Sequence, residues 1–260
     1  LKSEGDSPMK KAIILSLIFY GYQFLVALLF ILINVIRKEP NPTALGVNAL
    51  GLSVLLSGLM MVGHLIYCRD VKFGWKSFFA VPLRYILLCL PLVLSAMFFL
   101  NTVNEMLDLP DFGEATFNML SRNVFGVLSM VIVAPFVEEL LFRGAIEGHF
   151  LKQGKSPAFA IVVSSLFFAV VHLNPAQMFF AFLLGLLLGW LYYRTGSVMP
   201  GVFCHFINNG IAVLSMILYP DETTTEMLED TMSLVMILAI SLVVFAVSFF
   251  YAKKQLPKPL

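Results

Sequence analysis

The chain has little charge: only 13% of its 260 residues are Asp, Glu, Lys or Arg, about half the share found in an ordinary soluble domain. It also lacks an excess of either sign, with 17 Lys and Arg against 16 Asp and Glu. The chain therefore has no net basic excess to attract nucleic acid, and no nucleic-acid partner is predicted. The three cysteines, Cys68, Cys89 and Cys204, are odd in number and lie in or beside apolar segments, which argues against a disulfide framework.

Apolar residues make up most of the chain, with 59% hydrophobic residues and 25 Phe. Many apolar segments run for about 20 residues, the length that a helix needs to cross the roughly 30 Å hydrocarbon layer of a bilayer. The predicted spans are 12–35, 45–67, 78–100, 122–146, 157–173, 176–193, 198–219 and 232–251. We therefore predict an all-α, polytopic membrane helical bundle of about eight transmembrane helices, with the lipid bilayer as its surroundings.

Residues 1–8 are polar and precede the start-like Met9-Lys10-Lys11, so we interpret them as a remnant of recombinant expression outside the fold. Residues 9–260 are predicted to form a single transmembrane domain. Placing both termini inside leaves only Arg37, Lys38 and Arg122 among the basic residues of the outer loops, as the positive-inside rule requires. We expect an integral multi-pass membrane protein with both termini in the cytoplasm. The compact chain with short loops favours a bacterial plasma membrane.

The fourth span contains the ionisable residues Glu138, Glu139 and Arg143, and charges within a span are expensive enough to indicate function. Glu139 and Arg143 are four residues apart and are predicted to pair on one helix face. Glu138 points about 100° away and stays available for proton transfer. Pro135, three residues earlier, is expected to disturb the helix and make room for water.

Two further spans each carry a histidine four residues from a second candidate site residue. Phe168 and His172 lie in the fifth span, and His205 and Asn209 lie in the seventh. An imidazole and a carboxamide on one face can donate to an oxyanion or orient a water molecule. Each histidine alone could equally be an interhelical hydrogen-bonding residue, and Asn208 is an alternative neighbour of His205.

The three motifs, Glu138-Glu139-xxx-Arg143, Phe168-xxx-His172 and His205-xxx-Asn209, resemble in this order those of the CAAX protease and bacteriocin-processing enzyme (CPBP) family, also called type II CAAX prenyl endopeptidases or the Abi family. The resemblance covers about 122–215, the motif-bearing core. It implies an intramembrane peptidase in which Glu138 activates water with His172, while His205 and Asn209 stabilise the oxyanion. Glu139 and Arg143 would brace the site, with Phe168 as a supporting residue.

Zinc is the alternative cofactor, since Glu138, His172 and His205 could form a catalytic ligand set with an open water position. However, the sequence has no HExxH motif, the three candidate ligands come from separate helices, and zinc would leave Asn209 unexplained. A metal-free glutamate mechanism is therefore favoured, with no metal ligand assigned.

The predicted partner is a membrane-associated peptide or protein substrate. It could be a prenylated CAAX peptide, a bacteriocin or pheromone precursor, or a membrane-anchored regulator, because the same water chemistry would cut all of them. Two other functions stay open from sequence alone: a non-catalytic membrane scaffold or regulator, and a proton-coupled transporter with Pro135 marking a broken helix.

Overall fold

The computed structural model describes residues 7–71, 81–220, 225 and 230–257. Most of the predicted remnant at 1–8, the first residues of the predicted span at 78–100 and most of the loop at 220–231 lie outside this range. All regular elements in the described part are helices. They are α1 (Pro8–Ile36), α2 (Val47–Tyr67), α4 (Leu83–Met106), α5 (Glu114–Ser121), α6 (Val124–Leu128), η1 (Ser129–Val133), α7 (Ala134–Glu138), η2 (Glu139–Glu147), α8 (Gly148–Lys152), α9 (Pro157–Val170), α10 (Pro175–Thr195), α11 (Met199–Leu218) and α13 (Thr231–Gln255).

The helical bundle confirms the predicted membrane architecture. In the described residues, seven helices are long and apolar enough to cross a bilayer. The remaining predicted span, the fifth at 157–173, is shorter than expected, because α9 has 14 residues and is about 21 Å long at 1.5 Å per residue. Leu173, with a positive φ of 51°, and Pro175 separate α9 from α10.

Helix α1 begins earlier than predicted. Pro8 is its first residue, and the hydroxyl of Ser7 accepts a hydrogen bond from the backbone N–H of Lys10 at 3.2 Å. Proline suits the first helical turn because its missing N–H would have no intrahelical partner there. Ser7 and Pro8 are therefore part of the fold, although the sequence analysis excluded them.

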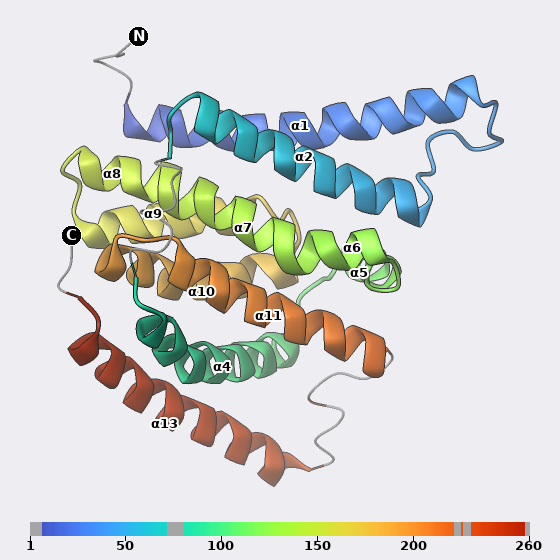
Figure 1. The fold of residues 1–260 in the computed structure, drawn as a ribbon. Helices are drawn as coiled ribbons and strands as arrows, with labels where there is room; N and C mark the ends of the chain where they lie inside the picture. The colour runs from blue at the N-terminus through green and yellow to red at the C-terminus, as the bar shows by residue number, and fades with distance from the viewer. Residues whose placement is uncertain (1–6, 72–80, 221–224, 226–229, 258–260) are drawn as a thin grey trace.

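The helices form three layers (Figure 1). One layer consists of α1 and α2, which pack along each other. The central layer contains the continuous helix from Val124 to Lys152 together with α9, α10 and α11. On the other side, α4 packs against α10 and α11, and α13 lies outermost on α4.

The central helix contains two π-helical segments, η1 and η2, on either side of α7. In η1 the N–H of Ala134 donates to the carbonyl of Ser129, five residues back. Pro135 follows and has no N–H to donate. The sequence predicted a disturbance at Pro135, and the structure shows that it takes the form of wider, π-helical turns. Such turns are rare in proteins overall, and those that occur are often found at functional sites.

Candidate active site

The motif residues come from the central layer. Glu138 ends α7 and Glu139 begins η2, while His205 and Asn209 lie on α11. His172 lies in the turn after α9. The packing of α11 against η1 and α7, and of α9 against η2, brings these segments together.

Glu139 and Arg143 form the ion pair expected from their spacing. Arg143 Nε lies 3.2 Å from Glu139 Oε2, and both side chains are completely buried. Gly201 of α11 permits this arrangement, since a Cβ at that position would lie 2.7 Å from the same Glu139 oxygen. Burial of both charges makes each of them depend on the other, because an isolated charge in this low-dielectric interior is costly.

His205 lies between the two glutamates. Its Nδ1 is 3.3 Å from Glu139 Oε1, and its Nε2 is 3.7 Å from Glu138 Oε2. Both carboxylates are acceptors, so each ring nitrogen can carry a proton toward the glutamate that it faces, Nδ1 toward Glu139 and Nε2 toward Glu138. Arg143, Glu139, His205 and Glu138 therefore form one continuous polar row.

Glu138 is the accessible end of this row. Its side chain is 15% exposed, whereas that of Glu139 is fully buried. Glu138 lines a cavity of about 70 Å³ between α1, α2 and α7, and Gln23 and Ser57 are the other polar residues of its lining. Since one water molecule occupies roughly 30 Å³ in the liquid, this cavity has room for about two waters beside Glu138.

Phe168 connects the polar residues of three segments. Its ring meets His172 and His205 edge-on, with centroid separations of 5.1 and 5.6 Å. The guanidinium carbon of Arg143 lies 4.8 Å from the centroid of the same ring. Such a contact stabilises a cation more strongly when it is desolvated, so this phenylalanine does more than fill the core.

His172 is held by the end of its own helix. Its Nδ1 is 2.8 Å from the carbonyl oxygen of Phe168, and because a carbonyl can only accept, Nδ1 donates. This bond orients the ring and leaves Nε2 for a substrate or a water molecule. Within the described residues, no hydrogen bond or ion pair joins His172 to Glu138, so their predicted cooperation remains a prediction.

Asn209 satisfies a carbonyl that Pro135 leaves without a backbone partner. In the i→i+5 pattern of η1, the carbonyl of Met130 would accept from residue 135, which is proline. Instead, Nδ2 of Asn209 donates to this carbonyl at 2.9 Å. A primary amide has two N–H bonds, so the contact leaves one that can donate to a substrate oxygen.

Asn208, the alternative neighbour of His205, has a different role in the structure. Its Nδ2 donates to Oδ1 of Asn209 at 3.0 Å. This bond identifies which end of the Asn209 amide carries the N–H groups. Asn208 therefore supports the orientation of Asn209: Asn208 donates to the Asn209 amide, which in turn donates to the Met130 carbonyl.

Glu147 was not identified from the sequence, because the predicted span ended at residue 146. It is completely buried, and neither carboxylate oxygen has a hydrogen-bond partner among the described residues. Arg143 and Glu139 are close enough to act on it electrostatically, and a Cβ at Gly189 would lie 2.7 Å from its Oε2. Its position four residues after Arg143 was the sequence signal that could have identified it as a further partner of that arginine.

The proposed zinc ligands are not gathered closely enough to bind one ion in this arrangement. Ligand atoms bound to a single zinc at 2.0–2.3 Å lie within about 4.6 Å of one another. In the described chain, three donors meet a limit of 4.8 Å only at His64, Cys68 and Asp70, outside this site. Glu138, His172 and His205 thus do not fit zinc here.

Comparison with known proteins agrees with the motif resemblance. Residues 120–211 match the family described as "Type II CAAX prenyl endopeptidase Rce1-like". A protein of Bacillus subtilis (strain 168) named "Putative membrane peptidase YdiL" is 30% identical over 118 residues, which cover 44% of this chain and 48% of that protein. The chain thus matches about half the length of this curated relative. No solved structure matches the chain significantly. The CPBP resemblance is confirmed for the part of the chain that carries the motifs.

Proposed function

We propose that this chain, whose residues 120–211 form a type II CAAX endopeptidase-like core, is an intramembrane endopeptidase that uses glutamate-activated water. One observation carries the proposal: Glu138 lines a water-sized cavity while the next polar group inward, His205 Nε2, lies 3.7 Å away. A carboxylate with access to water and a buried polar support behind it is the arrangement that general-base catalysis requires.

In the proposed reaction, Glu138 removes a proton from a water molecule as the water oxygen attacks the carbonyl carbon of the scissile peptide bond. The new C–O bond moves the carbonyl π electrons onto oxygen and forms a tetrahedral oxyanion. Glu138 then delivers its proton to the peptide nitrogen as the C–N bond breaks. The products are a carboxylic acid and an amine, and Glu138 returns to its initial state.

The other motif residues support this step. Glu139 orients His205 through Nδ1, and Arg143 neutralises Glu139. His205, with the remaining N–H of Asn209, is proposed to stabilise the oxyanion, and His172 to help position the water. Phe168 holds both imidazoles at its edge, which limits their rotation.

Peptide cleavage is predicted to be independent of metal. The motif side chains supply a base and oxyanion donors, and they are not gathered for zinc. Treatment of the purified protein with a membrane-permeant chelator should leave the cleavage rate unchanged, as measured by product formation before and after treatment. Loss of cleavage on chelation and its return with added zinc would contradict the prediction.

Asn209→Ala is predicted to lower kcat by about 10²–10³ with little change in KM, because an oxyanion donor acts mainly in the transition state. Asn208→Ala should have a much smaller effect, since the Asn209 amide keeps its bond to the Met130 carbonyl. Both variants should be assayed as monodisperse protein, with thermal midpoints measured in parallel. If both retained full kcat, the His205–Asn209 face would be a structural contact and the scaffold function would be favoured.

The proposed substrate is a peptide segment of a membrane-associated protein, because the catalytic residues lie on helices of a membrane bundle. Prenylated CAAX peptides, bacteriocin or pheromone precursors and membrane-anchored regulators all present such a segment.

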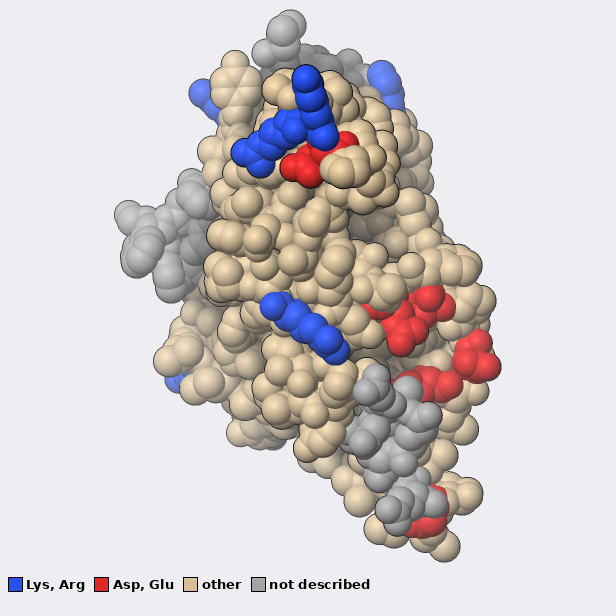
Figure 2. Space-filling model, turned by 90° about the vertical axis from the view of Figure 1, so that its right-hand side faces the viewer, with Lys and Arg blue, Asp and Glu red and all other residues tan. Residues whose placement is uncertain are grey.

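A bacterial plasma membrane with both termini in the cytoplasm is the proposed location. On the face opposite the termini, acidic side chains gather on the right of Figure 2, and Lys or Arg side chains lie at its top and near its centre. The proposed orientation rests on the sequence, which leaves only Arg37, Lys38 and Arg122 among the basic residues of the outer loops.

The function is tested by comparing the membrane proteomes of cells that produce the native chain or Glu138→Gln. An uncut precursor should accumulate only in the variant, and its processing site would identify the substrate class. Glu114→Gln, an exposed carboxylate on α5, is the matched control and should process normally. Identical proteomes in all three strains, at equal protein levels, would contradict the peptidase proposal.

A further inference from the structure

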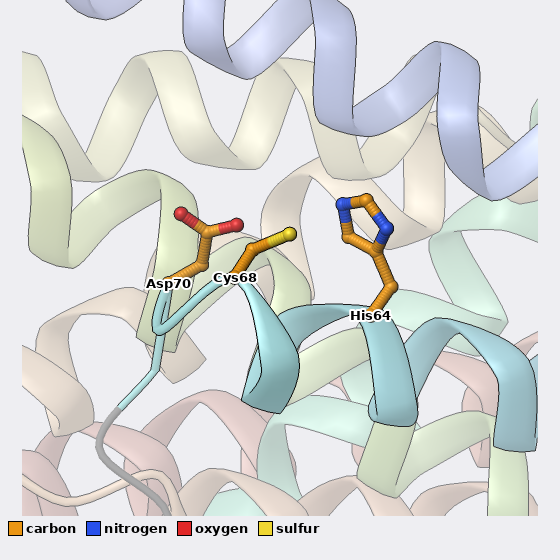
Figure 3. Close-up of side chains that lie close together, drawn as sticks. All are labelled: His64, Cys68 and Asp70. Carbon is orange, nitrogen blue, oxygen red and sulfur yellow. The ribbon is translucent and has the colours of Figure 1, made fainter. Parts of the chain in front are cut away.

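A second group of reactive side chains lies at the C-terminal end of α2. His64, Cys68 and Asp70 each offer one ligand atom, and these atoms all lie within 4.8 Å of one another. In Figure 3 the sulfur of Cys68 lies between the carboxylate of Asp70 and the ring of His64. The group is separate from the motif residues and does not depend on the proposed peptidase function.

The local fold explains how these three residues meet. His64 and Cys68 are four residues apart and share a face at the helix end. Arg69 then adopts a left-handed conformation with φ 58°, and the N–H of Asp70 donates to the Leu65 carbonyl at 2.9 Å. This turn ends the helix and brings the Asp70 carboxylate back toward the Cys68 thiol.

Residues of α1 contact two members of the group. The hydroxyl of Tyr22 lies 3.1 Å from Nδ1 of His64, which leaves Nε2 as the nitrogen available to a ligand. Metal-binding histidines are commonly oriented in this way by a hydrogen bond to their other nitrogen. Lys11 Nζ lies 2.5 Å from Asp70 Oδ1, so the Lys11 ammonium group already occupies one side of the carboxylate.

We propose that His64, Cys68 and Asp70 form a binding site for a zinc ion. The donor set of one imidazole, one thiolate and one carboxylate suits zinc, whereas calcium and magnesium prefer oxygen ligands alone. The thiolate and carboxylate together balance the charge of the divalent ion. Three protein ligands leave a fourth tetrahedral position for water, and the exposure of Cys68 gives the ion access from solvent.

A bound ion would connect the end of α2 to α1 through the contact of Tyr22 with His64. The same two helices contribute Gln23 and Ser57 to the cavity beside Glu138. The site therefore lies on the helix pair that forms one wall of the candidate active site, outside the catalytic residues themselves.

The proposal is tested on the purified full-length chain in detergent, by titration with zinc and by absorption spectroscopy with cobalt. We expect one zinc per chain and a thiolate-to-cobalt charge-transfer band. Cys68→Ser should abolish the band and weaken zinc binding by more than about 100-fold, since loss of a ligand should exceed the 10–100-fold cost of losing a supporting residue. Cys89→Ser is the matched thiol control, because Cys89 is buried in α4 and donates to the Tyr85 carbonyl, as serine can.

Two variants in α1 sharpen the test. Tyr22→Phe should weaken zinc binding by about 10–100-fold, because it removes the hydrogen bond that orients His64. Lys11→Met should strengthen binding, because it removes the ammonium ion that competes for Asp70. Equal zinc affinity in Cys68→Ser and Cys89→Ser, or no cobalt–thiolate band in the native chain, would overturn the proposal.

The outcome is independent of the peptidase proposal. Cys68→Ser should retain peptide cleavage, because none of the three ligands belongs to the Glu138 site. Zinc binding without cleavage would leave the metal site supported and contradict the proposed function. Cleavage without zinc binding would support the proposed function and contradict the metal site.

Discussion

Replacement of Glu138 by glutamine is expected to lower the rate of peptide cleavage by about 10²–10⁴, the usual contribution of a general base. Glutamine has the shape of glutamate but cannot accept the proton of the attacking water. The side chain is partly exposed on the cavity wall, so the variant should fold and insert normally. The measurement is kcat for a substrate peptide, with the thermal midpoint as a check of folding.

The control for this prediction is Glu139→Gln, which alters the neighbouring carboxylate. Glu139 is completely buried against Arg143 and His205, so its substitution should lower stability as well as activity. Glu138→Gln should lower activity alone. Full turnover by Glu138→Gln would remove the proposed mechanism.

Arg143→Ala is expected to destabilise the folded protein by about 3–5 kcal/mol, the usual cost of removing one partner of a buried ion pair. The substitution leaves Glu139 and Glu147 in the interior without their common cation, and it removes the cation from the Phe168 ring. The expected result is a low yield of monodisperse protein and a clearly lowered thermal midpoint. Cleavage should fall with the amount of folded protein.

Arg122→Ala is the matched control, because Arg122 is exposed in the turn between α5 and the same central helix. Surface substitutions usually change stability by less than about 0.5 kcal/mol, so its thermal midpoint should stay close to that of the native chain. Arg143→Lys should be intermediate, since it keeps the charge and loses the planar guanidinium that lies over Phe168. Equal stability of Arg143→Ala and Arg122→Ala would contradict a structural role for the buried pair.

Local sequence determined the elements and the close pairs within them. Apolar segments of about 20 residues must form membrane helices, because only internal hydrogen bonding satisfies the backbone in hydrocarbon. The Glu139–Arg143 pair followed from its four-residue spacing, which survives in the π-helical segment. The order of the three motifs also indicated the family that residues 120–211 match. Each of these features depends on residues near one another in the chain or on motif identity.

Tertiary structure decided the contacts between helices, which depend on how each helix is rotated and how closely it packs. It placed His205 between Glu138 and Glu139, rather than only beside Asn209, and Gly201 permits that approach. It also paired Asn209 with the Met130 carbonyl that Pro135 leaves free.

Burial of Glu147 was likewise a tertiary outcome. The hydrophobic pattern ended the span at residue 146, whereas the helix continues to Lys152, and it gave no sign of the space beside Gly189. Small residues on one helix decide which polar side chains of another can be enclosed, and their partners are distant in sequence. Periodicity therefore predicted which residues share a helix face. Only the packed bundle determined which faces meet, because close approach between helices depends on side-chain volumes contributed by both.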